Sequence, residues 1–365
     1  MRSLWRKSVL ACILAGFMGW CARPALAQDG GWRPYCPPQP CLPYEQLQPG
    51  QPPQLLTPPS AEAPATPAQP APEPAFAGEQ FAALGGSTAA FAESNVGYID
   101  DAIPQTQFRL RFDAAYDDNR PDRAEFFYAK CGCFRTAAPP FTDPHAPGPR
   151  LPETSVDYQD ISGYLEYAVG PRLSGFVNAP VRFLNPEQNA NTAGFADMDA
   201  GFKIAMIACP DRYLTFQFRT YIPTGAASHG LGTDHVSLEP ALLYYRRLDR
   251  LCFEGEFRVW DAIGGTDFAG DVLRYGIGLS YDVYRCGRLR VAPVIETVGW
   301  TVLDGKESTP LVPVQDASGD TIVNLKLGTR LWFGRGSSFY AGYGRALTGD
   351  VWYKDILRVE YRLKF

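Results

Sequence analysis

The chain has 365 residues, enough for two or three ordinary domains or for one large β domain. Mean hydropathy is −0.19, and only the N-terminus carries an apolar run comparable to a membrane-spanning helix, which excludes a helical membrane bundle. The net charge of −5 argues against a nucleic-acid-binding protein, because no basic surplus exists to neutralise phosphates. Aromatic residues make up 13% of the chain beside 35 glycines and 33 prolines, a composition typical of a β-rich protein with a disordered part.

Residues 1–27 have the layout of a secretory signal peptide. Basic residues near the start precede an apolar stretch at 9–20, and residues 25–27 form the small-x-small cleavage site Ala-Leu-Ala. A lipoprotein signal at Cys21 is the alternative, but the large Trp20 before it fits lipidation poorly. We therefore expect an exported chain in a compartment where disulfides persist.

Residues 28–75 are expected to form a Pro-rich periplasmic linker, since fifteen of these 48 residues are proline. Such a composition cannot bury a core and favours an extended, semi-rigid spacer. It either reaches the cell wall or a partner, or is an unstructured leader. Residues 76–96 are more apolar and are expected to form a short docking segment, which ends the linker region (28–96) before a domain over 97–365.

From about residue 106 to the end, apolar and polar side chains alternate with the period of a β-strand. In the last segment Leu357 and Val359 alternate with Arg358 and Glu360. Alternation also fits a soluble sandwich with one wet face, so it does not decide the fold class.

The lengths of the connections do decide it. Short turns and longer loops alternate between twelve expected strands, as they do in bacterial outer-membrane barrels. The strands are long enough for a tilted crossing of the hydrocarbon layer, which takes about 9 to 11 residues. We predict an all-β fold, a single antiparallel up-and-down barrel in the outer membrane of a double-membraned bacterium, with periplasmic short turns. The expected strands are 106–117, 157–169, 172–184, 194–207, 212–223, 235–247, 250–260, 271–284, 288–301, 321–333, 337–347 and 351–365.

The C-terminus supports this prediction independently. Phe365 ends the chain, with Leu363 and Tyr361 on the same face of the last strand as Tyr353 and Leu357. This ending resembles the signature that outer-membrane barrels present to the barrel-assembly machinery. That machinery and outer-membrane lipid are therefore the expected partners. The last strand must pair with the first, because an open edge in hydrocarbon leaves backbone groups unsatisfied.

Four phrases carry a resemblance to a known family: Gly-Thr-Asp-His-Val-Ser-Leu-Glu-Pro at 232–240, Arg-Tyr-Gly-Ile-Gly-Leu-Ser-Tyr at 274–281, Pro-Val-Ile-Glu at 293–296, and the Gly-rich run at 341–350. They resemble the porin-like barrels of the MetA pathway of phenol degradation and exported barrels of planctomycete-type bacteria. The likeness covers roughly residues 100 to 365 and lies in strand texture rather than in a catalytic motif. It implies an outer-membrane barrel with a transport role. The long first loop and the Pro-rich leader depart from the family, so no solute is carried over.

If the apolar face meets lipid, the opposite face lines the lumen, where charges must pair or contact water. Two functions remain open. The charges form ladders along a narrow channel for small polar or anionic solutes, or they fill the lumen of a structural, anchoring barrel. The candidate lumen-lining residues are Arg109, Arg111, Arg219, Glu239, Glu254, Glu256, Arg258, Arg274, Glu296, Lys326, Arg330, Arg358 and Glu360.

An outer-membrane lipid hydrolase is a more remote alternative. It would need a Ser/His pair, and Ser237 shares a strand face with His235, but no amide that orients the imidazole stands out. Cys131, Cys133 and His145 are too irregularly spaced for a metal site. We expect no enzyme, no cofactor and no metal.

The cysteines of the barrel allow one pairing prediction. Cys252 and Cys286 lie near the short-turn end of neighbouring expected strands, and we predict that they can form a disulfide. Cys131 and Cys133 remain in the outer loop, which leaves Cys209 as the odd thiol.

Overall fold

The computed structural model describes residues 92–286, 289–309, 314–334 and 336–365. The predicted signal peptide and the Pro-rich linker lie outside the described residues. Within the described ranges, no helix is long and apolar enough to cross a membrane.

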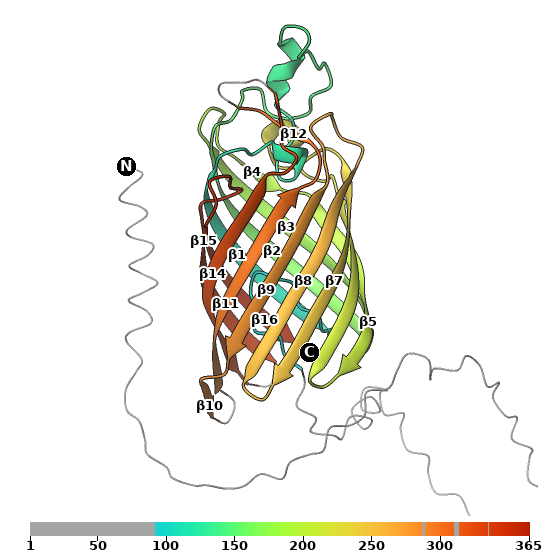
Figure 1. Ribbon diagram of the computed structural model, residues 1–365, viewed down its shortest axis with the longest axis vertical. Coiled ribbons are helices and arrows are strands. Elements are labelled where there is room, and N and C mark those ends of the chain that lie inside the picture. Colours follow the sequence, from blue (N-terminus) through green and yellow to red (C-terminus); the bar gives the residue numbers. More distant parts are fainter. Residues whose placement is uncertain (1–91, 287–288, 310–313, 335) are drawn as a thin grey trace, which may run out of the picture. The chain divides into compact units, whose positions relative to one another are not determined.

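Twelve long antiparallel strands form a closed barrel (Figure 1). Each strand pairs with its neighbours in chain order, β9 pairs directly with β11, and β16 pairs with β1 to close the wall. Short β4 (Thr192–Phe195) and β10 (Tyr284–Cys286) extend the sheet beside β3 and β11. The predicted twelve-stranded barrel is confirmed. Its strands are β1 (Gln107–Asp118), β2 (Val156–Gly170), β3 (Leu173–Pro186), β5 (Met198–Cys209), β6 (Arg212–Ile222), β7 (Val236–Leu248), β8 (Leu251–Ile263), β9 (Val272–Tyr281), β11 (Leu289–Val302), β14 (Thr321–Phe333), β15 (Ser337–Ala346) and β16 (Asp355–Lys364).

The two faces of the wall have opposite chemistry. Leu110, Ile277 and Leu327 on the outer face are 47%, 53% and 54% exposed, whereas Arg258 and Arg330 on the inner face are buried. An apolar exterior on a closed sheet suits hydrocarbon, because every ladder hydrogen bond is satisfied within the wall. The barrel is therefore an outer-membrane barrel, as predicted.

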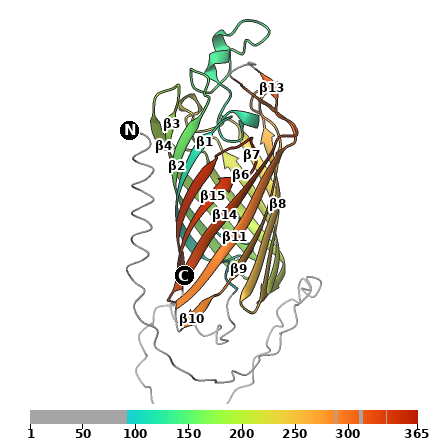
Figure 2. The same ribbon diagram turned by 60° about the vertical axis from the view of Figure 1, so that its left-hand side comes forward.

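The connections differ between the two ends of the barrel. At one end, the turn end, β2–β3, β5–β6 and β7–β8 are joined by short turns. At the other, the loop end, residues 119–155 form a long loop with short 3-10 helices η2 (Arg123–Glu125) and η3 (Gly132–Thr136). Figure 2 shows this loop standing over the loop end, and we call it the lid. The loop after β11 adds β12 (Lys306–Glu307) and β13 (Gln315–Asp316), and η4 (Ala227–His229) follows β6.

The last strand begins at Asp355 rather than at residue 351. Trp352 and Tyr353 turn inward at the loop end, where both are buried. Tyr353 was expected on the lipid face, but its hydroxyl accepts a hydrogen bond from Lys326 Nζ at 2.7 Å inside the barrel. The predicted strand includes residues 351–354, which precede β16 in the structure. The sequence pattern does not separate them from the strand, because buried loop residues are aromatic here as well.

The disulfide prediction is wrong. Cys252 and Cys286 are free thiols: Cys252 is buried on the inner face of β8, and Cys286 is exposed on β10. Cys286 does not lie on a strand next to Cys252, because β10 pairs with β11 and not with β8. Cys209 is disulfide-bonded rather than free. Cys131 and Cys133 are joined to each other in the lid.

Candidate functional site: the barrel lumen

Residues 92–106 run inside the barrel before β1 begins, and we call them the inner segment. Glu93 pairs with Arg290 near the turn end at 2.7 Å, and the segment then rises to its apex at Tyr98–Asp100. Ile103 packs again near the turn end, in a cluster with Leu243 and Tyr245. The boundary predicted between residues 96 and 97 falls inside this continuous segment.

Glutamates of the wall accept hydrogen bonds from the backbone of the inner segment. Glu296 accepts from the N–H groups of Gly97, Tyr98 and Ile99 at 3.0, 2.9 and 3.0 Å. Glu254 and Glu256 accept from the N–H groups of Asn95 and Asp100, each at 2.9 Å. These carboxylates replace the ladder partners that an irregular buried backbone lacks.

Arginines of the wall donate to the carbonyls of the same segment. Arg330 binds the carbonyls of Asn95 and Val96 at 2.9 and 2.7 Å. Arg358 binds the carbonyl of Gly97 at 2.6 Å, and Arg274 that of Tyr98 at 2.8 Å. The inward charges therefore hold a peptide in the lumen in addition to pairing with one another.

Two glycines make room for this segment. Gly276 and Gly278 occupy inward positions of β9, and a β-carbon on either would lie 2.6 Å from Ile99 Cγ2 or Val96 Cγ1. Glycine at alternate inward positions of a strand marks a close approach of another backbone. The two inward glycines are a feature of the sequence that could have indicated a segment inside the barrel.

All of the predicted lumen-lining residues point into the barrel, in three groups. Arg109 and Arg111 face open space beside the inner segment. Arg219 lines the same space and also binds Asp100 of the inner segment, and Glu239 lies directly behind it. Glu254, Glu256, Arg258, Arg274, Glu296, Arg330 and Arg358 contact the inner segment itself. Lys326 also meets the inner segment, since its Nζ is 4.1 Å from the centre of the Tyr98 ring, whereas Glu360 binds Arg330 of the wall at 2.8 Å.

A polar cavity of about 210 Å³ remains beside the apex of the inner segment. Arg182 and Asp160, opposite each other on neighbouring β3 and β2, pair at 2.9 Å on its wall. Arg109 makes no ion pair with any described residue, and its guanidinium lies 3.5 Å from the centre of the Tyr164 ring. The charged lining residues are Asp100, Arg109, Arg111, Asp160, Arg182, Asp197, Asp199, Arg219, Arg274, Arg358 and Glu360.

The apex carries a carboxylate into this cavity. Asp100 Oδ2 lies 2.6 Å from Arg219 Nη2 and 3.0 Å from Arg258 Nη2, so one oxygen binds two guanidinium groups. Behind them, Glu239 binds Arg258 at 2.8 Å and Arg219 at 3.3 Å. We call Arg219 and Arg258 the arginine clamp.

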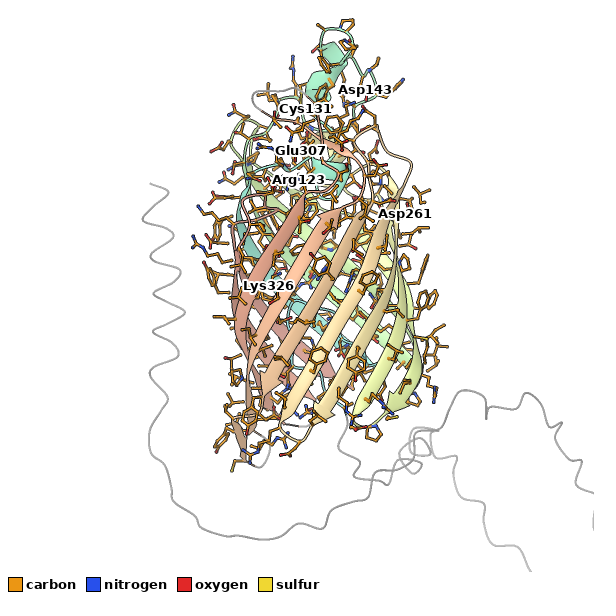
Figure 3. All side chains as sticks on the ribbon, viewed as in Figure 1. Arg123, Cys131, Asp143, Asp261, Glu307 and Lys326 are labelled. Carbon is orange, nitrogen blue, oxygen red and sulfur yellow. A yellow bond between two sulfur atoms is a disulfide. The ribbon has the colours of Figure 1, made fainter. Side chains whose placement is uncertain are left out.

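The lid covers the loop end through a buried arginine. Arg123 Nε lies 2.6 Å from Glu307 and 3.1 Å from Asp320, which are carried by the loop between β11 and β14 (Figure 3). Phe126 beside it packs on Trp260 and Trp352, with ring centres 5.1 and 4.6 Å apart. The lid is therefore held by both charge and aromatic packing.

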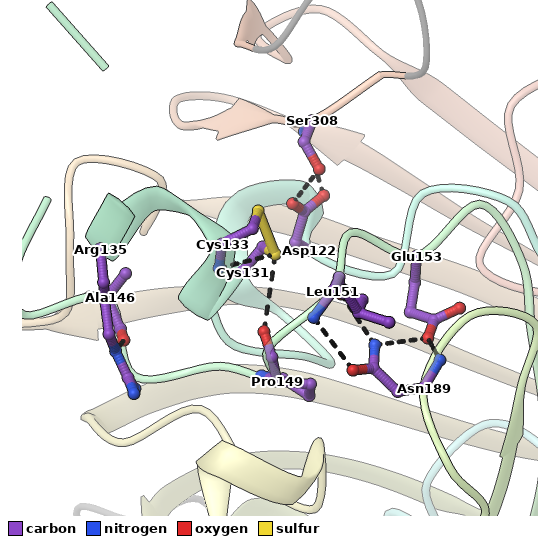
Figure 4. The surroundings of a disulfide bond; sticks show 10 residues. All are labelled: Asp122, Cys131, Cys133, Arg135, Ala146, Pro149, Leu151, Glu153, Asn189 and Ser308. Carbon is purple, nitrogen blue, oxygen red and sulfur yellow. Dashed lines mark hydrogen bonds between the residues drawn. A yellow bond between two sulfur atoms is a disulfide. The ribbon is translucent and has the colours of Figure 1, made fainter. Parts of the chain in front are cut away.

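A second contact ties the lid to the same loop (Figure 4). Asp122 accepts hydrogen bonds from Ser308, from its N–H at 3.1 Å and from its hydroxyl. Burial raises the pKa of the Asp122 carboxyl to about 6, although the bonds from Ser308 act in the opposite direction. Docking of the lid therefore shifts Asp122 toward its neutral form, which predominates below about pH 6.

His235 and Ser237 lie under the lid. Ser237 Oγ is 3.1 Å from His235 Nδ1, and His235 Nε2 is 3.8 Å from Glu125. Ser237 is buried and shares the inner face of β7 with Glu239, so this pair points to the lumen and not to lipid.

No protein-family model and no curated protein matches the chain. Among solved structures, the chain is similar to an outer membrane channel from Pseudomonas putida F1, at 12% identity and a TM-score of 0.46, covering 75% of this chain and 100% of that one. It is also similar to the NanC porin, at 8% identity and a TM-score of 0.42, covering 70% and 100%. A third similar structure is the β domain of the Bordetella autotransporter BrkA, at 12% identity and a TM-score of 0.42, covering 72% of this chain and 100% of that one. The resemblance to the MetA-pathway family stays a prediction.

Proposed function

We propose that the chain is an outer-membrane channel for small polar or anionic solutes. Its path runs through the polar cavity, between the inner segment and the wall formed by β1, β2, β3, β5 and β6. The observation that carries this proposal is the cavity of about 210 Å³ with the guanidinium of Arg109, which forms no ion pair with any residue that the structure describes. A guanidinium without a carboxylate partner attracts a mobile anion, whereas a paired one does not.

The described arrangement is the closed state in this proposal. The inner segment fills the lumen on the side of Glu296 and Arg330, and the lid covers the loop end. Both are irregular segments held by side-chain contacts rather than by a ladder, so they can exchange these contacts for water. Conduction requires the apex and the lid to move away from the path.

The alternative is a structural barrel whose lumen is permanently filled. The fully buried pairs Lys203–Glu166 at 3.0 Å and Arg330–Glu360 at 2.8 Å favour it. A lipid hydrolase is less well supported, because the hydroxyl of Ser237 faces the lumen. We also propose that Leu363 of β16 and Phe365 just beyond it, both exposed, are recognised by the barrel-assembly machinery. Residues 28–75 reach the cell wall in this proposal.

Ion currents across planar bilayers test the channel proposal. The refolded chain should give discrete steps and a reversal potential that shows anion preference in a salt gradient. Arg109→Gln should lower the anion preference. Arg345→Gln is the matched control, since this exposed arginine pairs with Asp355 at the loop end and does not line the cavity. Silence of the wild-type chain under all conditions would support the structural barrel instead.

A further inference from the structure

The arginine clamp holds one carboxylate of the protein itself. Asp100 belongs to the inner segment and not to the wall, so it reaches Arg219 and Arg258 only while the apex is in place. Its oxygen atoms occupy the side of the clamp that faces the cavity, because Asp100 and Arg219 both line that cavity.

The charge balance around the clamp depends on this carboxylate. Arg109 and Arg274 line the same cavity as Asp100. The fixed acids of the wall beside them are Asp199, Glu239 and Glu256. Withdrawal of Asp100 removes the carboxylate that binds both arginines of the clamp, and a carboxylate of a solute would restore this pairing in a partly dehydrated space.

We propose that the clamp is a carboxylate-binding site of the channel, and that Asp100 occupies it in the closed state in place of a carboxylate of the solute. The proposal rests on the channel function above and names its solute class: small organic molecules with one carboxylate. Guanidinium groups bind carboxylates through charge-assisted hydrogen bonds. A cavity of about 210 Å³ has the volume of roughly seven liquid waters, which suits a molecule of a few carbon atoms.

Asp100→Asn is the first test, since it removes the competing charge and keeps the side-chain volume. We expect the open probability in planar bilayers to rise about tenfold, the factor typical of a lost charge-assisted contact. Glu93→Gln is the matched control, because Glu93 lies on the same segment but pairs with Arg290 outside the cavity. An equal rise in both variants would overturn the special role of Asp100.

Propionate is the probe for the emptied clamp. Propionate at fixed ionic strength should reduce the chloride current through Asp100→Asn, and the reduction should be largely lost in Asp100→Asn/Arg219→Gln. Heat-modifiable migration on gels checks that each variant has folded. Phosphate that acts as strongly as propionate would contradict the carboxylate class, and an undiminished propionate effect in the double variant would contradict the clamp.

Calorimetric titration of propionate into folded Asp100→Asn in detergent separates the two proposals. Propionate binding without any current would support the site and contradict the channel. Current without propionate binding would support the channel and contradict the site.

Discussion

Arg358 of β16 binds Asp113 of β1 through two parallel hydrogen bonds, Nε to Oδ1 at 2.6 Å and Nη2 to Oδ2 at 2.7 Å. The pair lies across the seam that closes the barrel, where Asp113 is directly opposite Arg358 in the strand register. The same guanidinium donates to the carbonyl of Gly97. One arginine therefore joins the first strand, the last strand and the inner segment.

Arg358→Gln should destabilise the folded barrel by about 3 to 5 kcal/mol, because it leaves Asp113 buried without its main partner. Unfolding in urea, followed by gel migration, measures the change. Arg358→Gln/Asp113→Asn should recover part of the loss, and a double variant no more stable than Arg358→Gln would contradict the pair.

A charge on the outer face should be costly at mid-strand. Leu357 faces outward beside inward Arg358, so Leu357→Arg should cost about 2 to 4 kcal/mol. Leu347→Arg is the control, because this exposed residue lies just beyond β15 at the loop end, where the cost falls to about 0 to 1 kcal/mol. Equal unfolding free energies for the two variants in lipid would mean that Leu357 does not face hydrocarbon.

Removal of the lid's buried arginine should release the lid. Arg123→Gln leaves Asp320 without this cation and leaves Glu307 with Arg120 alone, at 3.4 Å, so the loop 119–155 should become more open to protease while the barrel stays folded. The digestion rate of intact liposome-bound protein measures this effect. Arg135→Gln is a suitable control, since Arg135 binds only the Ala146 carbonyl within the lid. Matching digestion rates would show that Arg123 does not hold the lid.

Lid docking should also depend on pH. The pKa of the Asp122 carboxyl is about 6 when the lid is docked, and it has the ordinary value of about 4 when the lid is released. Between about pH 4 and about pH 6, docking of the lid is therefore accompanied by uptake of a proton. Docking therefore weakens as pH rises from about 4 to 6, and changes no further above that range. Protease sensitivity of the lid should increase over this window, and Asp122→Asn should reduce the dependence. A wild-type lid that loosens instead on acidification contradicts the assignment.

Thiol chemistry tests the orientation and the cysteine assignments together. Short turns of outer-membrane barrels lie in the periplasm, so exposed Cys286 at the turn end should resist an impermeant maleimide on intact cells and react after lysis. Buried Cys252 should react in neither case. Cysteines placed in the loops 119–155 and 303–320 should be labelled on intact cells. Labelling of Cys286 on intact cells reverses the orientation.

The period-two pattern was sufficient to predict the strands, their inward faces and the pairing of the first strand with the last. These features repeat along the chain, so local sequence reports them. The inner segment was not predicted, because its backbone is satisfied by Glu296, Arg330 and Arg358, about 200 residues or more away. Inward glycines at 276 and 278 were the only trace of it on the wall. Contacts between residues so far apart along the chain leave no periodic pattern in the sequence.

A reversible cross-link between the inner segment and the wall tests the central claim most directly. Ile99→Cys and Gly276→Cys bring two β-carbons near the separation of about 3.8 Å that a disulfide needs, since a β-carbon on Gly276 would lie 2.6 Å from Ile99 Cγ2. Cys252→Ala and Cys286→Ser provide the background, and the same protein without the two new cysteines is the control for reduction of Cys131–Cys133 and of the disulfide of Cys209. We predict that the oxidised variant is silent in planar bilayers and that dithiothreitol restores anion-selective steps. Currents that are unchanged by reduction, or absent in both states, would contradict a channel closed by its own inner segment.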